Sequence, residues 1–177
     1  GYIRDDKSRS LGEGEYFVQV FNPKLRMIVV GAVHIAQALA PMAELANFEV
    51  TIVDPRGSFA SDARFPRLRL MDDWPDEALI KLSPDTRTAV VTLTHDPKID
   101  DPALLYSLKT NAYYIGCLGS TKTHISRLDR LKKAGVAEHS LTRLHGPAGI
   151  QLGGRAASEI ALSILAELIS IYHKTDV

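Results

Sequence analysis

The chain has 177 residues, which is enough for one well-buried domain and too few for two of typical size. Its hydrophobic content of 45% is that of an ordinary globular protein, and its formal net charge is zero. A balanced charge provides no global field for nucleic acid or an anionic membrane, and no apolar run approaches the ~20 residues that span a bilayer. The single Cys117 cannot form an internal disulfide, so we expect a cytoplasmic protein with no nucleic-acid or membrane partner.

The first part of the chain differs in composition from the rest. Residues 1–15 are polar and charged with little to bury, so we expect a flexible arm or the remnant of a linker there. The segment 16–21 predicts a short strand, and we expect the folded domain to cover 16–177.

From residue 25 onward, apolar runs rich in β-branched residues alternate with helical patterns. Runs that are apolar on both faces and separated by helices indicate a parallel sheet covered on both sides. The sequence therefore predicts a single α/β domain with a doubly wound, mainly parallel, Rossmann-like sheet in the strand order 3-2-1-4-5. Pro41 is expected to kink or divide the first helix. The expected strands are 25–30, 49–54, 67–71, 88–94 and 112–119, and the expected helices are 35–46, 76–82, 101–109, 121–134 and 157–173.

The turn after the first of these strands is similar to the start of a dinucleotide-binding fold. Gly31 permits a tight turn, and Asp54, 23 positions later, matches the acid that hydrogen-bonds a ribose hydroxyl. At the open end of a strand, this acid is expected to be solvated. Val33 places a branched side chain where a pyrophosphate would come closest, so a scaffold without a nucleotide remains an alternative. The cofactor-binding candidates of this region are Gly31, Ala32, Val33, His34, Asp54 and Arg56.

The loop after the fourth expected strand lies at the carboxyl edge of the sheet, where open α/β folds place ligands. Thr94, His95 and Asp96 are further cofactor-binding candidates, because the histidine and the acid could hold a proton or a ligand hydroxyl. Asp100 or Asp101 is expected instead to cap the following helix.

The loop after the fifth expected strand is rich in glycine. Its backbone N–H groups would suit an anion, so Gly116, Leu118, Gly119 and Ser120 are cofactor-binding candidates. The serine is also expected to cap the next helix. Cys117 is expected to be a small buried residue rather than a reactive thiol. The basic residues of that helix are expected to form a mostly solvated face; they are Lys122, Arg127, Arg130, Lys132 and Lys133.

No pattern in the sequence points to a catalytic centre. It contains no nucleophile elbow, P-loop or Ser–His–Asp signature. His34, His95, His124 and His145 lie in loops that could share one end of the sheet, but their spacing lacks a compact metal-binding pattern. We therefore predict neither catalytic nor metal-binding residues. The last helix, after a glycine-rich loop over 146–154, carries an apolar stripe that should pack on the sheet or on a partner.

Taken together, these stretches resemble the C-terminal Rossmann-like domain of the XdhC/CoxI family. The members of this family are maturation factors for molybdenum hydroxylases such as xanthine dehydrogenase and carbon monoxide dehydrogenase. The resemblance runs from about residue 16 to the end, and relatives carry either glycine or valine at the position of Val33. It rests on the order and spacing of GAVHIAQAL (31–39), VTIVDPR (50–56), FASDARFP (59–66), WPDEAL (74–79), TAVVTLTHDPKIDDPAL (88–104), YYIGCLGSTKTHISRL (113–128) and HGPAGIQLGGRAASEIALSILAEL (145–168).

The resemblance implies an accessory factor rather than an enzyme. Such a factor binds molybdenum cofactor (molybdopterin), supports its sulfuration, and delivers it to the apo-enzyme of a molybdenum hydroxylase, with a cysteine desulfurase as a further partner. Family members usually carry an N-terminal half with a cysteine implicated in cofactor binding, for which 1–177 offers no counterpart. Ala156 and Ala157 replace the Thr-Pro or Ser-Pro pair of relatives, which weakens the expected cap of the last helix.

Two other hypotheses stay open on the sequence alone. A nicotinamide-dependent oxidoreductase would bind NAD(P) or another nucleotide at the same edge, but it would also need a substrate domain. A docking module would use the final helix in a homodimer or partner interface and leave the edge empty. Bound nucleotide would argue against the docking module, and hydride transfer would single out the oxidoreductase.

Overall fold

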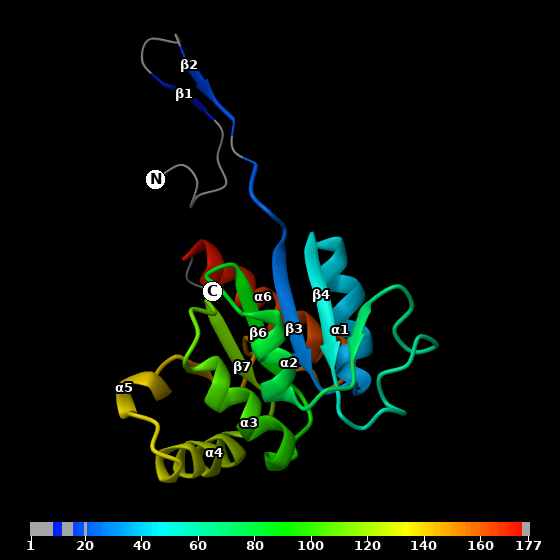
Figure 1. The fold of residues 1–177 in the computed structure, drawn as a ribbon, viewed down its shortest axis with the longest axis vertical. Coiled ribbons are helices and arrows are strands. Elements are labelled where there is room, and N and C mark those ends of the chain that lie inside the picture. Colours follow the sequence, from blue (N-terminus) through cyan, green and yellow to red (C-terminus); the bar gives the residue numbers. More distant parts are fainter. Residues whose placement is uncertain (1–8, 12–15, 20, 175–177) are drawn as a thin grey trace.

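The computed structural model describes residues 9–11, 16–19 and 21–174. Strands β1 (Arg9–Leu11) and β2 (Tyr16–Val18) form an antiparallel hairpin that Figure 1 shows apart from the main sheet. The predicted strand over 16–21 is thus confirmed in its first half. Within the predicted arm, β1 is a paired strand that composition did not indicate, and the remaining arm positions, 1–8 and 12–15, lie outside the described residues.

The main sheet has six parallel strands in the order β5-β4-β3-β6-β7-β8. Its first five strands along the chain reproduce the predicted 3-2-1-4-5 order, and the α/β prediction is confirmed. The sixth strand was not predicted, because two residues are too short for a recognisable apolar run. The strands are β3 (Leu25–Val30), β4 (Phe48–Val53), β5 (Arg69–Met71), β6 (Thr88–Thr92), β7 (Tyr114–Cys117) and β8 (Leu144–His145).

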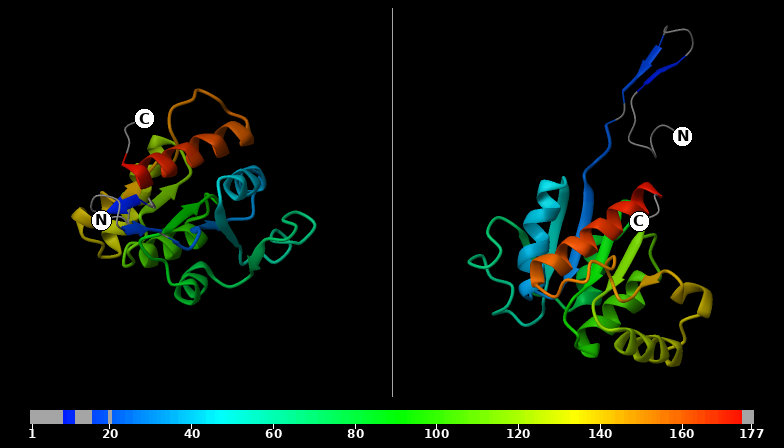
Figure 2. Two further views of the ribbon diagram at one scale, coloured as in Figure 1. Left: turned by 90° about the horizontal axis from the view of Figure 1, so that it is seen from above. Right: turned by 180° about the vertical axis from the view of Figure 1, so that it is seen from behind.

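Helices cover both faces of this sheet, as the two views of Figure 2 show. Helices α1 and α6 pack together on one face, and α2, α3 and α4 lie on the other. Pro41 lies within α1 and its ring is exposed; the helix runs from His34 to Leu45 without being divided there. The helices are α1 (His34–Leu45), α2 (Pro75–Leu82), α3 (Pro97–Ser107), α4 (Thr121–Lys133), α5 (Glu138–Leu141) and α6 (Ala157–His173).

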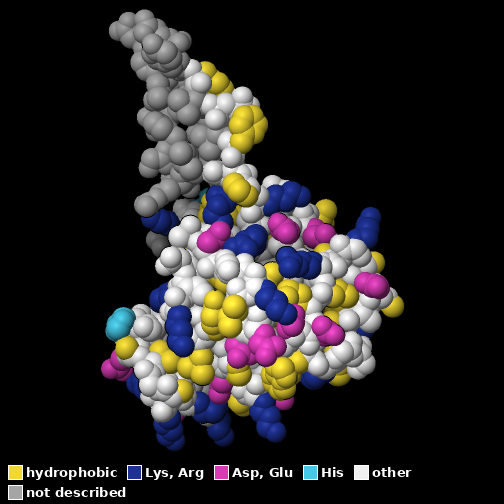
Figure 3. All heavy atoms as spheres, in the orientation of Figure 1, with side chains coloured by type: hydrophobic (Ala, Val, Ile, Leu, Met, Phe, Trp, Pro, Cys, Tyr) yellow, Lys and Arg dark blue, Asp and Glu magenta, His cyan; other side chains and the backbone are white. Residues whose placement is uncertain are grey.

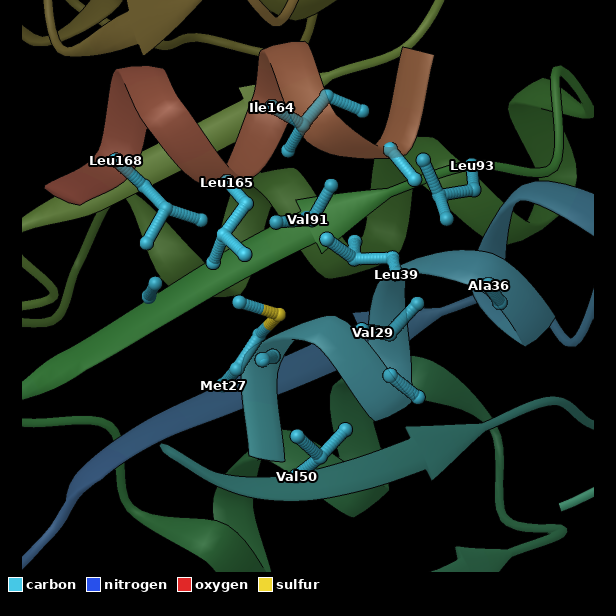
Figure 4. Close-up of a cluster of buried hydrophobic side chains, with 14 of the residues drawn as sticks. Met27, Val29, Ala36, Leu39, Val50, Val91, Leu93, Ile164, Leu165 and Leu168 are labelled. Atoms are coloured by element: carbon cyan, nitrogen blue, oxygen red, sulfur yellow. The ribbon is translucent and has the colours of Figure 1, made fainter. Parts of the chain in front are cut away.

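Two hydrophobic cores follow from the alternation of side chains along each strand. Met27 and Val29 of β3 point to the α1/α6 side, where Figure 4 shows them beside Leu39 and Leu165. The intervening Ile28 belongs to the core under α2 and α3. The apolar stripe of α6 is thereby buried against its own sheet, as one of the two predicted options required. Among the described residues, no helix is long and apolar enough to cross a membrane.

Candidate functional site at the carboxyl edge of the sheet

The loops that carry the predicted ligand residues meet at one end of the sheet. They follow β3, β4, β6 and β7, which are parallel neighbours, so their carboxyl ends share one edge. The chain crosses from β3 to β4 on one side and from β6 to β7 on the other, so the connections diverge between β3 and β6. Open α/β sheets bind ligands at such a point. We call this region the carboxyl edge; it comprises residues 31–34, 54–56, 94–96 and 118–120.

The turn after β3 is as tight as predicted. Gly31 has φ +110°, and its N–H donates to the carbonyl of Val53 at 2.8 Å. A Cβ at this position would lie 2.6 Å from Cγ2 of Thr94, so the glycine lets the loop after β6 approach. Val33 then occupies the N-cap of α1 without a side-chain hydrogen bond. The first turn of this helix therefore has no capping side chain and presents N–H donors to the edge.

Asp54 holds the ends of β3 and β4 together. Its Oδ2 accepts from the backbone N–H of Ala32 at 2.8 Å and from Nη2 of Arg56 at 2.7 Å. Its Oδ1 accepts from the N–H and the Nε of Arg56, at 3.0 and 2.9 Å. The carboxylate is 0% exposed, which corrects the expectation of a solvated acid. The reason is that the next loop folds an arginine back over the end of its strand.

The charge state of Asp54 follows from these contacts. Burial by itself would raise the pKa of the Asp54 carboxyl, but the hydrogen bonds from Arg56 and Ala32 outweigh it and hold the pKa below its ordinary value. The same pairing raises the pKa of Arg56. Both carboxylate oxygens are thus used within the chain. A ligand hydroxyl at Asp54 would have to share or displace one of these donors.

The loop after Arg56 is held by cation–aromatic and backbone contacts. The Arg56 guanidinium lies 4.2 Å from the ring centroid of Phe59, and Arg64 donates to the carbonyl of Phe59 and to Oε1 of Gln37. This loop and the end of β5 together border a hollow of about 470 Å³. It is lined by Gly57, Ala60, Ser61, Asp62, Leu70, Met71 and Asp72.

Thr94 organises the loop after β6. Its hydroxyl accepts from the N–H of Asp96 at 3.0 Å and donates to Oδ1 of Asp100 at 2.7 Å. His95, between Thr94 and Asp96, is exposed and has φ +62°, a left-handed backbone conformation that few non-glycine residues adopt. The predicted candidates Thr94, His95 and Asp96 therefore do lie together at the carboxyl edge.

The capping prediction for α3 was wrong. Asp96 is the N-cap and accepts from the N–H of Lys98 at 2.9 Å, with Pro97 as the first helical residue. The helix begins four residues before the predicted start, because an Asx cap followed by proline is a stronger signal than the later acids. Asp100 is instead 2% exposed, and burial raises its pKa; Asp101 pairs with Arg130 at 2.6 Å.

The candidates that were predicted for the loop after β7 are divided between the strand itself and the loop. Gly116 lies inside β7, and the Tyr114 ring fills the space that a side chain would take. The N–H of Leu118 donates to the carbonyl of Thr92 at 2.9 Å. Gly116 is therefore not open to close approach by a ligand, and the N–H of Leu118 is already used, so neither acts as the anion donor that was predicted. Cys117 is 0% exposed, which confirms the expectation of a small buried residue, and burial raises the pKa of its thiol to about 12.

Ser120 caps α4 as predicted, and its hydroxyl accepts from the N–H of Thr123 at 3.1 Å. Gly119 precedes it with φ +144°. The expectation of a solvated basic face on α4 was wrong for Arg127, which is 1% exposed and donates from Nη2 to the carbonyl of Leu118 at 2.8 Å. The helix is short of apolar residues on its inner face, so the arginine fills that position. No sequence pattern distinguished it from its basic neighbours.

The histidines do not converge on a metal. Among the described residues, no group of three His, Cys, Asp or Glu side chains is placed to hold one. His145 stacks on Tyr114 with ring centroids 4.8 Å apart, and Glu167 of α6 accepts from the Tyr114 hydroxyl and, at 2.7 Å, from the N–H of Gly149. This network ties the glycine-rich loop to β7. Sequence reasoning missed it, because its members are distributed over three elements.

The fold is that of a Rossmann-type α/β domain, and its carboxyl edge presents backbone N–H donors at the start of α1. Residues 27–168 match the family described as the XdhC Rossmann domain, and the chain belongs to this family. The resemblance stated from the motifs is thereby confirmed.

Similar proteins from three bacteria support the assignment. The chain is 29% identical over 154 residues to a protein of Bacillus subtilis named as a probable xanthine dehydrogenase subunit, covering 86% of this chain and 44% of that protein. It is 32% identical over 151 residues to the "Molybdenum cofactor insertion chaperone PaoD" of Escherichia coli, covering 85% and 41%. A crystal structure described as a xanthine dehydrogenase from Bacillus halodurans superposes with a TM-score of 0.74 at 27% identity, covering 88% of this chain and 44% of that one. The chain thus spans less than half the length of these relatives.

Proposed function

We propose that this chain is the Rossmann-like part of a molybdenum-cofactor maturation factor. In this role it binds the cofactor at the carboxyl edge and supports its delivery to the apo-enzyme of a molybdenum hydroxylase. The observation that carries the proposal is the match of 27–168 to the XdhC Rossmann domain. The similarity to a protein named as a molybdenum cofactor insertion chaperone, over 85% of this chain, supports the same role.

The donors at the edge fit the organic, anionic part of such a cofactor. The uncapped first turn of α1 and the turn Gly119-Ser120 before α4 both present backbone N–H groups, which favour phosphate. Arg56 adds a cation whose side chain is 33% exposed. These residues would hold phosphate and hydroxyl groups, and the cofactor itself supplies the molybdenum chemistry when it is bound.

The residues of the edge do not fit the metal end of the cofactor. Molybdenum bound to sulfur calls for soft ligands, and an accessible thiolate is the side chain that supplies one. Cys117 is the only cysteine in the sequence, it is fully buried, and its pKa is raised to about 12. We therefore propose a division of labour in which this domain holds the phosphate end and a thiol outside 1–177 handles the metal end. A cysteine desulfurase is the proposed source of sulfur.

Reconstitution tests the proposal. The purified chain is mixed with molybdenum cofactor and a cofactor-free xanthine dehydrogenase-type enzyme, and substrate oxidation is compared with that obtained with a full-length family member. We expect the chain to bind the cofactor in a direct titration but not to activate the enzyme alone. Activation equal to that of the full-length protein would refute the division of labour, and absence of cofactor binding would refute the proposed ligand.

A matched pair of variants locates the binding. Ser120→Asp keeps a good N-cap but places a carboxylate at the proposed phosphate donors, so cofactor affinity should fall. Lys133→Gln lowers the charge of the same helix by the same single unit at its other end and should leave the affinity unchanged. Equal effects of the two substitutions would show that only the net charge of α4 matters.

A further inference from the structure

Arg127 is a buried cation with unused hydrogen-bonding capacity. A guanidinium carries five N–H donors, and a buried charge is costly unless it is paired. The side chain is 1% exposed, and its Nη2 donates to the carbonyl of Leu118 at 2.8 Å. Within the described part of the chain, Nε and Nη1 have no hydrogen-bond partner. The domain therefore holds a buried guanidinium, two of whose nitrogens have no hydrogen-bond partner among the described residues.

No carboxylate of the described residues closes this gap. The nearby acid is Asp100. Burial raises its pKa, and the hydrogen bond from the Thr94 hydroxyl and the charge of Arg127 offset only part of that rise. That carboxylate accepts its hydrogen bond from Thr94, and no ion pair joins it to Arg127 within the described residues. Asp100 balances the charge at a distance, but it does not occupy the free donors.

A second unpartnered group lies one turn earlier on the same helix. His124 is half-buried, and its Nδ1 is inaccessible and has no hydrogen-bond partner in the described structure. Its ring packs against Gly146, where any side chain would overlap it. Residues three apart in a helix share a face, so His124 and Arg127 lie on the same side of α4.

The Arg127 side chain is directed toward the start of α4, whereas Nδ1 of His124 lies against Gly146. Side chains in a helix lean toward its N-terminus, and the bond from Arg127 to Leu118 places the guanidinium under the turn that leads into the helix. In that turn, Gly119 has φ +144° and lacks a side chain, and Ser120 is exposed. Figure 3 shows further Lys and Arg side chains along the lower margin of the molecule, where Figure 1 places α4. The helix start is thus approached from within the domain by the guanidinium of Arg127.

We infer that the N-terminus of α4 is a phosphate-binding site in which the buried Arg127 completes the coordination begun by the backbone of Gly119 and Ser120. The ligand class is a phosphate group with a free dianionic end. An oxyanion there would receive N–H donors from the helix start and charge-assisted hydrogen bonds from the guanidinium. The inference deepens the proposed function, on which it rests for the source of the phosphate group.

The test uses inorganic phosphate as the probe, added to the intact chain at constant ionic strength with sodium chloride as the reference. Melting temperature and isothermal titration calorimetry are the readouts. We expect phosphate to raise the melting temperature with concentration and chloride to have no such effect. Arg127→Met should weaken phosphate binding about tenfold or more, because a charge-assisted contact is lost. Without phosphate, this variant should be as stable as the wild type or more stable, because a partly unpaired buried charge is removed.

Two further variants keep the inference open to refutation. Arg130→Met, on the same helix but paired with Asp101, is the control and should bind phosphate normally. If Arg127→Met does not fold, Ser120→Asp keeps the cap and should still abolish phosphate binding. Unchanged phosphate affinity in Arg127→Met or in Ser120→Asp, or a wild type that responds equally to chloride, would overturn the site.

Competition identifies the source of the phosphate group. Displacement of inorganic phosphate by intact molybdenum cofactor would place the cofactor in this site. Arg127-dependent phosphate binding that the cofactor does not displace would support a site for free phosphate and would contradict the proposed cofactor contact. Failure of the site and failure of the proposed function are therefore distinguishable.

Discussion

The Arg56 guanidinium donates two hydrogen bonds to the carboxylate of Asp54, from Nε to Oδ1 at 2.9 Å and from Nη2 to Oδ2 at 2.7 Å. The two residues are two positions apart, and the acid stands where a dinucleotide-binding protein keeps its ribose-binding carboxylate. In this domain that carboxylate also holds the N–H of Ala32, so it connects two strand ends. Its first role is therefore structural.

Asp54→Asn should lower the free energy of unfolding at neutral pH by roughly 2–4 kcal/mol, since it breaks a buried charged pair and its backbone contacts. The folded-state pKa of this acid lies below its ordinary value, so its contribution is complete above the unfolded pKa and is lost as the pH falls through the folded pKa. The stability difference between wild type and variant should thus shrink in acid. Urea titrations across pH measure it. Asp72→Asn, at an exposed acid after β5, is the control, and a pH-independent difference would contradict the assignment.

Gly31→Ala should destabilise the domain by roughly 2–4 kcal/mol, because the added Cβ meets Cγ2 of Thr94 and the backbone is left-handed. Combining it with Thr94→Ser, which removes Cγ2 and keeps the hydroxyl, should recover part of that loss. Chemical denaturation of the four variants of this cycle measures the coupling. Gly57→Ala meets no atom within 4 Å and should be nearly neutral. Additive effects of the two substitutions would show that the contact does not matter.

NAD and NADP should bind weakly, or in a pose displaced from that of dinucleotide-binding proteins. Val33 takes the position of the glycine that lets a pyrophosphate approach, and Asp54 is already occupied by Arg56. Calorimetry with both dinucleotides gives the affinities. Val33→Gly should tighten any dinucleotide binding if the side chain is the obstacle. Tight binding by the wild type, in the ordinary pose of a co-crystal, would contradict this prediction.

Cys117 should not react with a thiol reagent at pH 8 while the domain is folded. The side chain is 0% exposed, and its pKa is raised to about 12, so almost no thiolate forms and none is accessible. Labelling with Ellman's reagent in buffer and in denaturing guanidinium gives the comparison, with one thiol expected only after unfolding. Rapid labelling of the folded chain would reopen a direct metal-binding role for this domain.

Much of the fold followed from the sequence. Strand β3 was predicted at its observed bounds because it is a continuous run rich in β-branched residues, and α6 likewise because its long apolar stripe has a helical period. Strand order followed from the alternation of strands and helices together with the handedness of crossovers. The short elements β1, β8 and α5 were missed, since two to four residues carry no periodic signal.

The candidate site was less predictable. The strand ends indicated which residues lie at the carboxyl edge, and Gly31, Asp54 and Thr94 lie together there as expected. The hydrogen-bond partners of these residues could not be predicted in the same way. The contact of Asp54 with Ala32 spans 22 positions, and that of Tyr114 with Glu167 spans 53. Ligand contacts at these residues stay predictions.

By itself, the sequence determined the class of fold, the family and the edge at which a ligand is expected, because hydrophobic periodicity and motif spacing are properties of the chain. The tertiary structure decided which polar groups at that edge are already satisfied. It pairs Asp54 with Arg56, places Gly116 inside β7, and buries Arg127 with its Nε and Nη1 unpartnered among the described residues. The physical reason is that a hydrogen bond needs its donor and acceptor within about 3 Å. That proximity between distant segments is set only when helices and strands pack.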